Sequence, residues 1–497
     1  MRLRATEEGV IVQRLSGTDA LFLSAETPAW LQSVGGLTIL DPADSPDFSY
    51  DAVVANLRER IALVPKLRWK LRSVPLGLDR PVWVADRDFD LDNHLHRVTV
   101  PRPGGRRETA EVVGKILGHQ IDRSRPLWEL WYLDGIVNGR VAMVMKYHHC
   151  MLDGVAGSGM ASLMLDLEQF PEEPPAPPPT VDDPSEPSEL ELLARGAFTA
   201  STSPLRAARY SAQLARRALS VANFARSNEL PPFMAAPPSP INGPVGQRRA
   251  FSFASVSLAD VKAVRRAFGV KANDVFLALC AGALRSHLLE RGELPDKPLT
   301  TGVPVSTREE GDDSLDNRVA FMLVSLATDI ADPAERIAAI HRSSTNAKAF
   351  TAAFRSTGLN SLGEVAPPLV VQSAIRLAAG SGLLDHMPSM SNTLISNVPG
   401  PPFTLWSVGA KVTGIFSTSV IMQDMGANIT LFSYGDRVDF GIHVDPDVVA
   451  DPWAIADALP VAMAELMTAA GLGAPTPVED AFGAHQPRRA RRRRSAD

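Results

Sequence analysis

The 497-residue sequence contains only two cysteines, Cys150 and Cys280. Two cysteines cannot form the repeated pairs of a disulfide-rich secreted scaffold, so a reducing, cytoplasmic compartment is expected. Long apolar runs are also missing. The longest uncharged apolar stretches, such as Phe276–Leu284, are shorter than the ~20 residues that a membrane-spanning helix requires. The opening residues lack the apolar centre of a signal peptide, so export by that route is not expected.

Basic charge is scarce outside the C-terminal end. The formal net charge is −6, and removing the six arginines and one aspartate of residues 488–497 leaves 44 basic and 55 acidic residues, a net charge of −11. An acidic body is unlike a nucleic-acid-binding protein, so no nucleic-acid partner is expected. The arginine run at 488–494 would be attracted to an anionic membrane, at ~1 kcal/mol per basic residue near the surface. A solvated, disordered tail is the alternative.

Hydrophobic patterning predicts a mixed α/β protein in two parts. Alternation typical of strands occurs at Val34–Leu40, Pro81–Ala85, His96–Val100 and Val141–Tyr147. The stretch Pro171–Glu189 is rich in proline, which lacks an amide donor, and is predicted to be a linker. We therefore expect an α/β domain at 1–170, a linker with a basic helix at 171–245, a second α/β domain at 246–475, and a disordered tail at 476–497.

The sequence HHCMLDG, residues 148–154, follows the last of the strands in the first part. Because side chains alternate along a strand, His148 and His149 should point to opposite faces, and only one can enter a given cleft. This disfavours a shared metal, and no metal site is expected. Asp153 would cap the following helix or fix the loop that aims the imidazole, and Gly154 would ease the turn. Cys150 could be a nucleophile, but apolar filling is favoured.

The HHxxxDG pattern resembles that of the coenzyme-A-dependent acyltransferase superfamily, and more closely the bacterial wax ester synthase/diacylglycerol acyltransferase family. Further motifs similar to that family extend across most of the chain, in the expected order. They are LSGTDALFL at 15–23, RPLWEL at 125–130, INGP at 241–244, NDVFLALCAGALR at 273–285, VPVSTR at 303–308 and SNVPGPP at 396–402.

The resemblance implies an α/β (α+β) fold of two chloramphenicol-acetyltransferase-like domains, with mixed sheets flanked by helices and an active-site tunnel between them. It implies that His149 is the general base, with His148 and Asp153 beside it in the catalytic motif. Asn273 is the candidate donor to the oxyanion, although a helix cap at Asn273 or Asp274 is an equal alternative. Gly154, Trp128 and Asp274 are expected to bind substrate, with a core position as the alternative for Trp128.

The implied activity is transfer of a long-chain fatty acyl group from acyl-CoA, used as a co-substrate without a cofactor, to diacylglycerol or a fatty alcohol. An imidazole has an ordinary pKa of ~6.5, so its neutral form can accept a proton, which contributes ~10²–10⁴-fold to a rate. A thioester suits this modest base, because its thiol leaves easily. The alternatives are a carrier-protein thioester, a different alcohol or amine acceptor, or a non-catalytic lipid-surface binding protein.

Lipid substrates imply that the protein reaches a membrane or lipid-droplet surface, so a cytoplasmic protein peripherally associated with the inner membrane or lipid droplets is expected. The basic, helix-forming stretch 190–228 carries apolar residues among its arginines. It could lie in a membrane interface or pack on its own protein as a connector, and the connector is slightly favoured.

Overall fold

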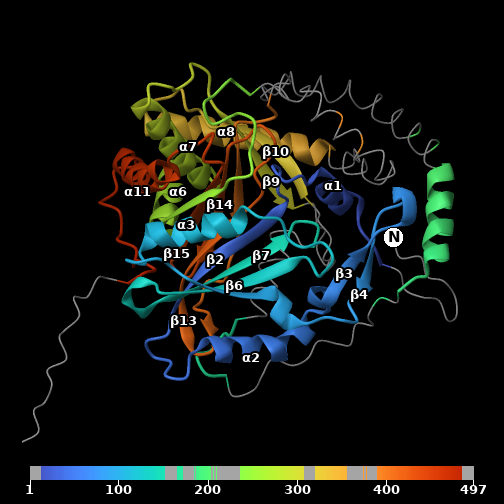
Figure 1. Cartoon of the computed structure of the whole chain (residues 1–497). Helices are drawn as coiled ribbons and strands as arrows, with labels where there is room; N and C mark the ends of the chain where they lie inside the picture. The colour runs from blue at the N-terminus through green and yellow to red at the C-terminus, as the bar shows by residue number, and fades with distance from the viewer. Residues whose placement is uncertain are drawn as a thin grey trace, which may run out of the picture.

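The computed structural model describes residues 13–151, 165–171, 186–202, 236–306, 319–354 and 389–483, and single residues between these ranges at 184, 205, 209, 373 and 377. Two six-stranded mixed sheets form the centre, and a small three-stranded sheet lies to one side (Figure 1). The small sheet has the strand order β1 (Gln13–Arg14), β4 (Val82–Ala85) and β3 (Trp69–Arg72).

The first large sheet, called here the N-terminal sheet, is antiparallel except where β5 pairs with β6. Its strands, in spatial order, are β12 (Trp406–Ser407), β13 (Ala410–Thr418), β2 (Ser33–Asp41), β7 (Val141–His148), β6 (Trp128–Asp134) and β5 (Leu95–Thr99). The predicted strands at 34–40, 96–100 and 141–147 are therefore confirmed as β2, β5 and β7, and the one at 81–85 is confirmed as β4.

The second large sheet, called here the C-terminal sheet, is mixed because β11 runs parallel to both of its neighbours. Its strands, in spatial order, are β10 (Val319–Ser325), β9 (Thr300–Ser306), β11 (Thr393–Val398), β14 (Ala427–Tyr434), β15 (Arg437–Val444) and β8 (Ala250–Ser257).

Helices pack against the strands of both halves. Within the described residues, the C-terminal half contains α6 (Leu258–Phe268), α7 (Ala272–Glu290), α8 (Pro333–Phe354) and α11 (Pro452–Ala469), and the N-terminal half contains α1 (Gly17–Ala25), α2 (Tyr50–Arg60) and α3 (Arg106–Leu117). Short 3₁₀ turns lie at Ile61–Leu63, Pro65–Arg68, Pro75–Gly77, Leu91–His94 and Val137–Gly139.

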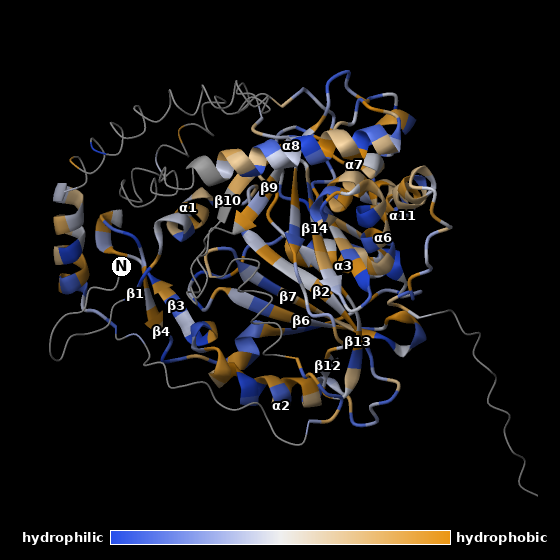
Figure 2. Cartoon of the chain, turned by 180° about the vertical axis from the view of Figure 1, so that it is seen from behind, coloured by the Kyte–Doolittle hydropathy of each residue, from blue (hydrophilic) through white to orange (hydrophobic). Residues whose placement is uncertain are grey.

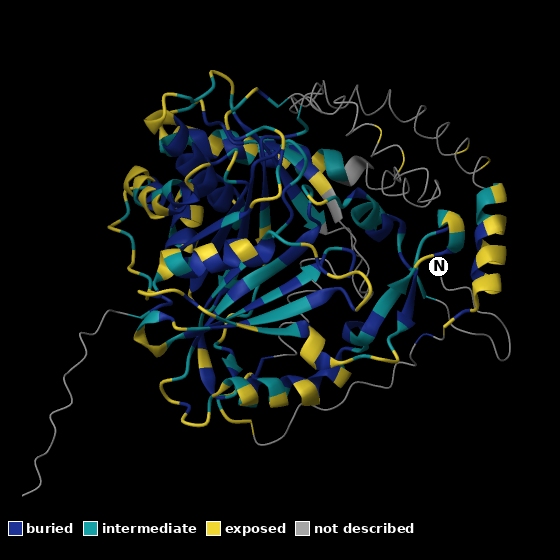
Figure 3. Ribbon diagram, in the orientation of Figure 1, coloured by how far each residue is buried: buried dark blue, intermediate teal, exposed yellow. Residues whose placement is uncertain are grey.

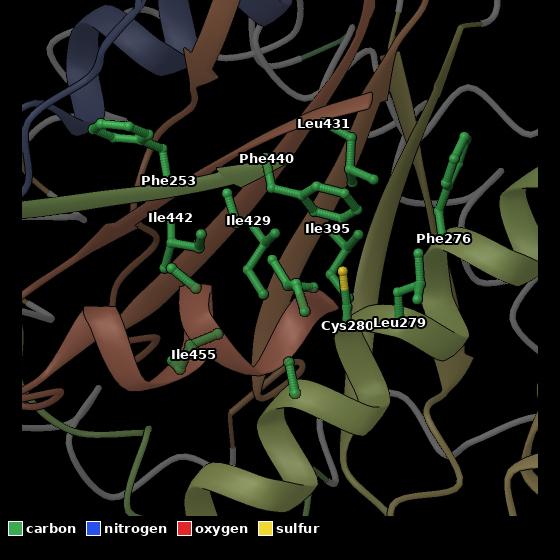
Figure 4. Packing of buried hydrophobic residues seen from close by; sticks show 14 of the residues in the cluster. Phe253, Phe276, Leu279, Cys280, Ile395, Ile429, Leu431, Phe440, Ile442 and Ile455 are labelled. Carbon is green, nitrogen blue, oxygen red and sulfur yellow. The ribbon is translucent and has the colours of Figure 1, made fainter. Parts of the chain in front are cut away.

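One hydrophobic core joins α7 and α11 to one face of the C-terminal sheet. Ile429 and Leu431 of β14 point towards these helices and pack near Cys280 and Ile455 (Figure 4). Figure 3 shows the same strands and α7 as almost continuously buried, whereas α2 is exposed along its outer side. The same core extends through α3 to the N-terminal sheet, so the two halves share one apolar interior.

Strand β13 connects the halves by exchange. It comes from residues 410–418, inside the predicted second domain, but pairs with β2 in the N-terminal sheet, with Thr418 opposite Gly35. Sheet membership therefore crosses the boundary that the sequence suggested at 246–475. Chain order alone does not reveal this, because the alternation within a strand does not specify which sheet edge the strand joins.

Gly35 allows the close approach of the paired strands. A Cβ atom at this position would lie 2.0 Å from the Met145 carbonyl oxygen of β7, a distance that no side chain tolerates. Glycine at this position therefore allows β2 to pack closely against β7.

No single helix in the described part of the chain has both the length and the apolar composition for crossing a membrane. One bent pair, α6 and α7, meets these criteria only when its two helices are taken together across a 104° bend.

We expect Ile429→Ala to lower the free energy of unfolding by about 2–5 kcal/mol, because Ile429 is fully buried and the truncation leaves a cavity. The control is Val461→Ala on the exposed side of α11, which should change it by less than about 0.5 kcal/mol. Urea unfolding measures both, and equal losses in the two variants would contradict the assigned core.

Candidate functional site

A cavity of about 230 Å³ lies between the two large sheets. Strands β2, β6, β7 and β13 of the N-terminal sheet line one side, and β9, β10, β11 and β14 of the C-terminal sheet line the other. Most of the lining is apolar, including Met143, Met145, Leu394 and Phe432. Such a lining suits an aliphatic chain and holds little water. The site therefore depends on both halves of the chain, as the sequence suggested.

The alternation along β7 separates the two histidines. Met143, Met145, Tyr147 and His149 line the cavity. The intervening side chains, Ala142, Val144, Lys146 and His148, are 0–1% exposed and belong to the opposite face. The prediction that the histidines point to opposite faces is confirmed, and His149 is the one that reaches the cavity.

The ring of His149 is held by stacking. It lies parallel to the ring of Phe22 from α1, with centroids 4.1 Å apart and an interplanar angle of 7°. Its backbone amide donates to the Gln32 carbonyl oxygen at 2.7 Å, next to the start of β2. The stacking and this hydrogen bond restrict the ring to the cavity side of the turn, so an imidazole is presented to whatever occupies the cavity.

His148 belongs to a charged cluster in which the side chains of His148 and Glu26 are buried and that of Arg123 is exposed. Its Nδ1 accepts a hydrogen bond from the Cys150 amide at 3.1 Å, so in the neutral ring the proton resides on Nε2, which faces Glu26 Oε2 at 3.6 Å. Arg123 Nε donates to the same carboxylate oxygen at 2.9 Å, and the Gln32 amide donates to Glu26 Oε1 at 3.4 Å. His148 thus fixes the turn that carries His149, and Glu26 ties that turn to β2.

The charges of this cluster shift its pKa values in opposing ways. Burial alone would raise the pKa of Glu26, but its hydrogen bonds with His148 and Arg123 and the charge of Arg123 outweigh burial and lower the pKa to about 2. Burial lowers the pKa of His148, and the carboxylate of Glu26 opposes that shift only in part. The expected pair is an ionised Glu26 beside a neutral His148, which leaves the positive charge on Arg123.

Trp128 is a core residue that also borders the cavity, and its binding of substrate stays a prediction. It is 1% exposed, stacks on His94 with centroids 4.6 Å apart, and donates its indole N–H to the Leu67 carbonyl oxygen at 2.7 Å. It also borders the cavity. Packed and hydrogen-bonded in this way, the indole forms a rigid part of the wall.

Asn273 and Asp274 lie at the start of α7, and neither is among the described residues that line the cavity. The Asp274 carboxylate is buried and accepts hydrogen bonds from the Lys271 amide at 2.9 Å, from Ser344 Oγ at 2.5 Å and from His341 Nδ1 at 2.6 Å. Asp274 therefore caps α7 and ties it to α8. The proposed oxyanion role of Asn273 stays a prediction, as does substrate binding by Asp274.

The other two predicted site residues, Asp153 and Gly154, lie outside the described residues. Within the described ranges, no group of three or more His, Cys, Asp or Glu side chains could hold a metal ion. Burial raises the pKa of the Cys150 thiol well above its usual range, so a thiolate nucleophile is disfavoured there.

Glu26, Arg123 and Phe22 were not identified from the sequence. Phe22 lies inside the LSGTDALFL motif, Glu26 comes three residues after it, and Arg123 precedes RPLWEL by two residues. The sequence shows only one acidic residue, Glu26, after the first motif and one basic residue, Arg123, before the second. The pair becomes informative only when the fold brings them together.

We expect Glu26→Gln to remove a pH-dependent part of the stability. Because the pKa of Glu26 is lowered from 4.5 to about 2, its charge stabilises the fold above about pH 4.5, and this contribution disappears as the pH falls towards 2. Thermal unfolding of wild type and variant across pH 2–7 should therefore show a melting-point difference that is largest above about pH 4.5 and shrinks below it.

The matched control for this substitution is Glu168→Gln at an exposed position. A pH-independent difference for Glu26→Gln, like that expected for a neutral surface change, would disprove the buried ionised carboxylate.

Comparison with known proteins gives a consistent result. Residues 15–276 match the wax ester synthase/diacylglycerol acyltransferase catalytic domain, and residues 315–467 match the corresponding C-terminal domain. A relative from Mycobacterium tuberculosis strain H37Rv, by name a diacylglycerol O-acyltransferase, is 37% identical over 461 residues, 92% of this chain and 90% of the relative. A second one from the same strain, tgs2, is 35% identical over 435 residues, 85% of this chain and 92% of the relative.

Among solved structures, the wax ester synthase/diacylglycerol acyltransferase of Marinobacter aquaeolei VT8 superposes with a TM-score of 0.65 at 28% identity, covering 93% of this chain and 100% of that one. The first condensation domain of the calcium-dependent antibiotic synthetase superposes with a TM-score of 0.57 at 14% identity, covering 94% of this chain and 98% of that one, which shows a shared fold.

Proposed function

The chain belongs to the wax ester synthase/diacylglycerol acyltransferase family, and we propose that it transfers a long-chain acyl group from acyl-CoA to the hydroxyl of diacylglycerol, of a fatty alcohol, or of both. The observation that carries the proposal is the position of His149, whose ring borders an apolar cavity between the two halves. No cofactor is required for this chemistry, because the thioester is already activated.

His149 is proposed as the general base. Its imidazole takes the proton of the acceptor hydroxyl while the oxygen attacks the thioester carbonyl carbon, and a tetrahedral intermediate forms. When that intermediate collapses, the carbon–sulfur bond breaks, the new ester is released, and the imidazolium returns the proton to the coenzyme A thiolate. The base is regenerated, and no acyl-enzyme forms. The raised pKa of Cys150 is consistent with direct transfer.

Exclusion of water is the second requirement of the proposal. A base that activates an alcohol also activates water, which would hydrolyse the thioester. The cavity supports transfer over hydrolysis, because it lies between two sheets and most of its wall surface is apolar. An acceptor with a long apolar chain fills such a space and displaces solvent from the imidazole.

We expect His149→Ala to lower acceptor-dependent thiol release from palmitoyl-CoA by about 10²–10⁴-fold, because general-base assistance is lost. The assay compares thiol release with dioleoylglycerol, with hexadecanol and without an acceptor. The ratio of the rates with the first two identifies the preferred acceptor. His96→Gln, on β5 and away from the cavity lining, is the control and should keep activity.

Three results would contradict the proposal. Equal thiol release with and without acceptor would indicate a thioesterase. Palmitoyl-CoA binding without any release would indicate a lipid-binding protein. Full activity of His149→Ala would remove the imidazole from the mechanism.

The same proposal requires a route to a lipid surface, and the helix at residues 189–202 supports one. Leu192 is buried against Val74, Val82 and Val84 near the small sheet, so one side of the helix packs on its own protein. The other side exposes Leu190 at 76% and Phe198 at 72%. Figure 3 shows this helix, coloured green at the right edge of Figure 1, as largely exposed.

We propose that this exposed side docks on an anionic membrane or lipid-droplet surface at the cytoplasmic face. Arg195 is exposed on the helix, and Figure 2 shows hydrophobic and hydrophilic residues alternating along it. Arg195 is the single basic residue at 189–202, and Glu189 and Glu191 are exposed in the first turn, so the exposed apolar side chains support docking and net charge does not. The arginine run at 488–494 lies outside the described residues, and its contribution to docking is proposed on charge alone.

We expect the double substitution Leu190→Ser/Phe198→Ser to weaken binding to liposomes containing anionic lipid by at least about 10-fold, because each side chain loses apolar burial. Removing residues 488–497 should weaken it further, most strongly at low salt. Flotation measures binding, and Leu289→Ser at an exposed position on α7 is the control. Unchanged flotation of the double variant, or an equal loss in the control, would disprove docking through this helix.

A further inference from the structure

The wall of the cavity opposite His149 contains a polar group that the acyl-transfer mechanism does not use. Along β14, Ile429 and Leu431 point into the helix-covered core (Figure 4). Asn428, Thr430 and Phe432 alternate with them and line the cavity. An asparagine in an otherwise largely apolar wall needs a physical reason, because its amide loses hydration there.

The amide of Asn428 is half satisfied. The side chain is 1% exposed, and its Oδ1 accepts a hydrogen bond from the Thr430 hydroxyl at 2.8 Å. Its Nδ2 is buried and has no hydrogen-bond partner among the described residues. Thr430 therefore fixes the orientation of the amide and leaves its N–H groups, which can only donate, at the cavity wall.

A second donor borders the same cavity. The hydroxyl of Thr418, at the end of β13, is buried and likewise lacks a partner within the described part of the chain. Asn428 and Thr418 lie near the same point, because His443 is opposite Asn428 in the strand register and its Nδ1 contacts the carbonyl oxygen of Ser419. Three buried groups without a partner among the described residues therefore lie close together: the donors of Asn428 and Thr418, and Nε2 of His443, which is outside the cavity lining. Because the two donors border the cavity, an acceptor atom of a ligand can reach them there.

A nearby asparagine shows what a purely structural amide looks like in this fold. Asn392, just before β11, is fully buried, but its Oδ1 accepts from the Thr300 amide at 2.8 Å, and its Nδ2 donates to the Pro237 carbonyl oxygen and to Asn242 Oδ1, each at 2.8 Å. Asn392 is also absent from the cavity lining. Protein groups satisfy both ends of Asn392 but only one end of Asn428.

We propose that Asn428, oriented by Thr430, is a substrate-positioning residue that donates a hydrogen bond to a carbonyl oxygen of an acyl lipid in the cavity. The inference rests on the proposed acyl transfer and identifies which atom of the lipid this part of the wall recognises. Two lipids carry such an oxygen: the acyl thioester itself, and the ester groups of a diacylglycerol acceptor.

The variant that tests the proposal is Asn428→Leu/Thr430→Val, which removes the donor together with the hydroxyl that orients it. Both partners of the Asn428–Thr430 hydrogen bond are replaced by apolar residues, so neither position keeps a buried polar group without a partner. The melting temperature should therefore stay the same or rise. Asn392→Leu is the matched control, and it should lower the melting temperature because the hydrogen bonds of this side chain to Thr300, Pro237 and Asn242 are lost. A comparable fall for the double variant would assign Asn428 a structural role and overturn the proposal.

Binding is measured in a His149→Ala background, so that no turnover occurs and the result does not depend on the proposed activity. One pair of probes is palmitoyl-CoA and S-hexadecyl-CoA, a thioether without the carbonyl. The other pair is dioleoylglycerol and its diether analogue, dioleylglycerol, which has no ester carbonyls. With Asn428 intact, the carbonyl-containing member of one pair should bind about 3- to 10-fold more tightly.

The double variant should lose that preference while keeping its affinity for the probe without a carbonyl. Loss within the coenzyme A pair assigns Asn428 to the thioester, and loss within the glycerolipid pair assigns it to the acceptor. Unchanged preferences in both pairs would overturn the proposal. Failure of the proposed function would instead appear as wild-type protein without acceptor-dependent thiol release.

Discussion

The two-residue period of a β-strand is the constraint on which this site depends. Consecutive residues at the end of β7 must leave the chain in opposite directions, so one imidazole faces the buried cluster and its neighbour faces the cavity. The cluster of Glu26, Arg123 and His148 fixes the backbone, and His149 needs only a stacked ring and a hydrogen-bonded amide to hold its direction. Chemistry and positioning are thus divided between adjacent residues of the same motif.

The cavity exists because neither half of the chain is complete alone. β13 leaves the C-terminal half to pair with β2, and β14 remains behind in the C-terminal sheet to form the facing wall. The strand that joins the halves and the strand that faces it are therefore close in sequence but belong to different sheets. The cavity between the sheets is lined by both strands. It therefore contains Thr418 from β13 and Asn428 from β14 as well as His149.

Much of the fold could be predicted from local pattern. The alternation in β2, β4, β5 and β7 identified these strands, and the separation of His148 from His149 followed from geometry alone. The exchange of β13 could not be predicted, because the alternation of apolar and polar residues in a strand does not specify which strand it pairs with. Glu26 and Arg123 were missed for a related reason: they are almost a hundred residues apart, and only tertiary structure makes them an ion pair. At Asp274 the helix cap that the sequence offered as an alternative is confirmed, and substrate binding by this residue stays a prediction.

The exchanged strand also has a consequence for biosynthesis. As the polypeptide leaves the ribosome, β2 emerges hundreds of residues before residues 410–418. Until then the backbone N–H and C=O groups along one margin of β2 have no strand to pair with, and such an open margin is a template for association with other chains. The N-terminal sheet therefore cannot close this edge of β2 until the C-terminal half has been synthesised.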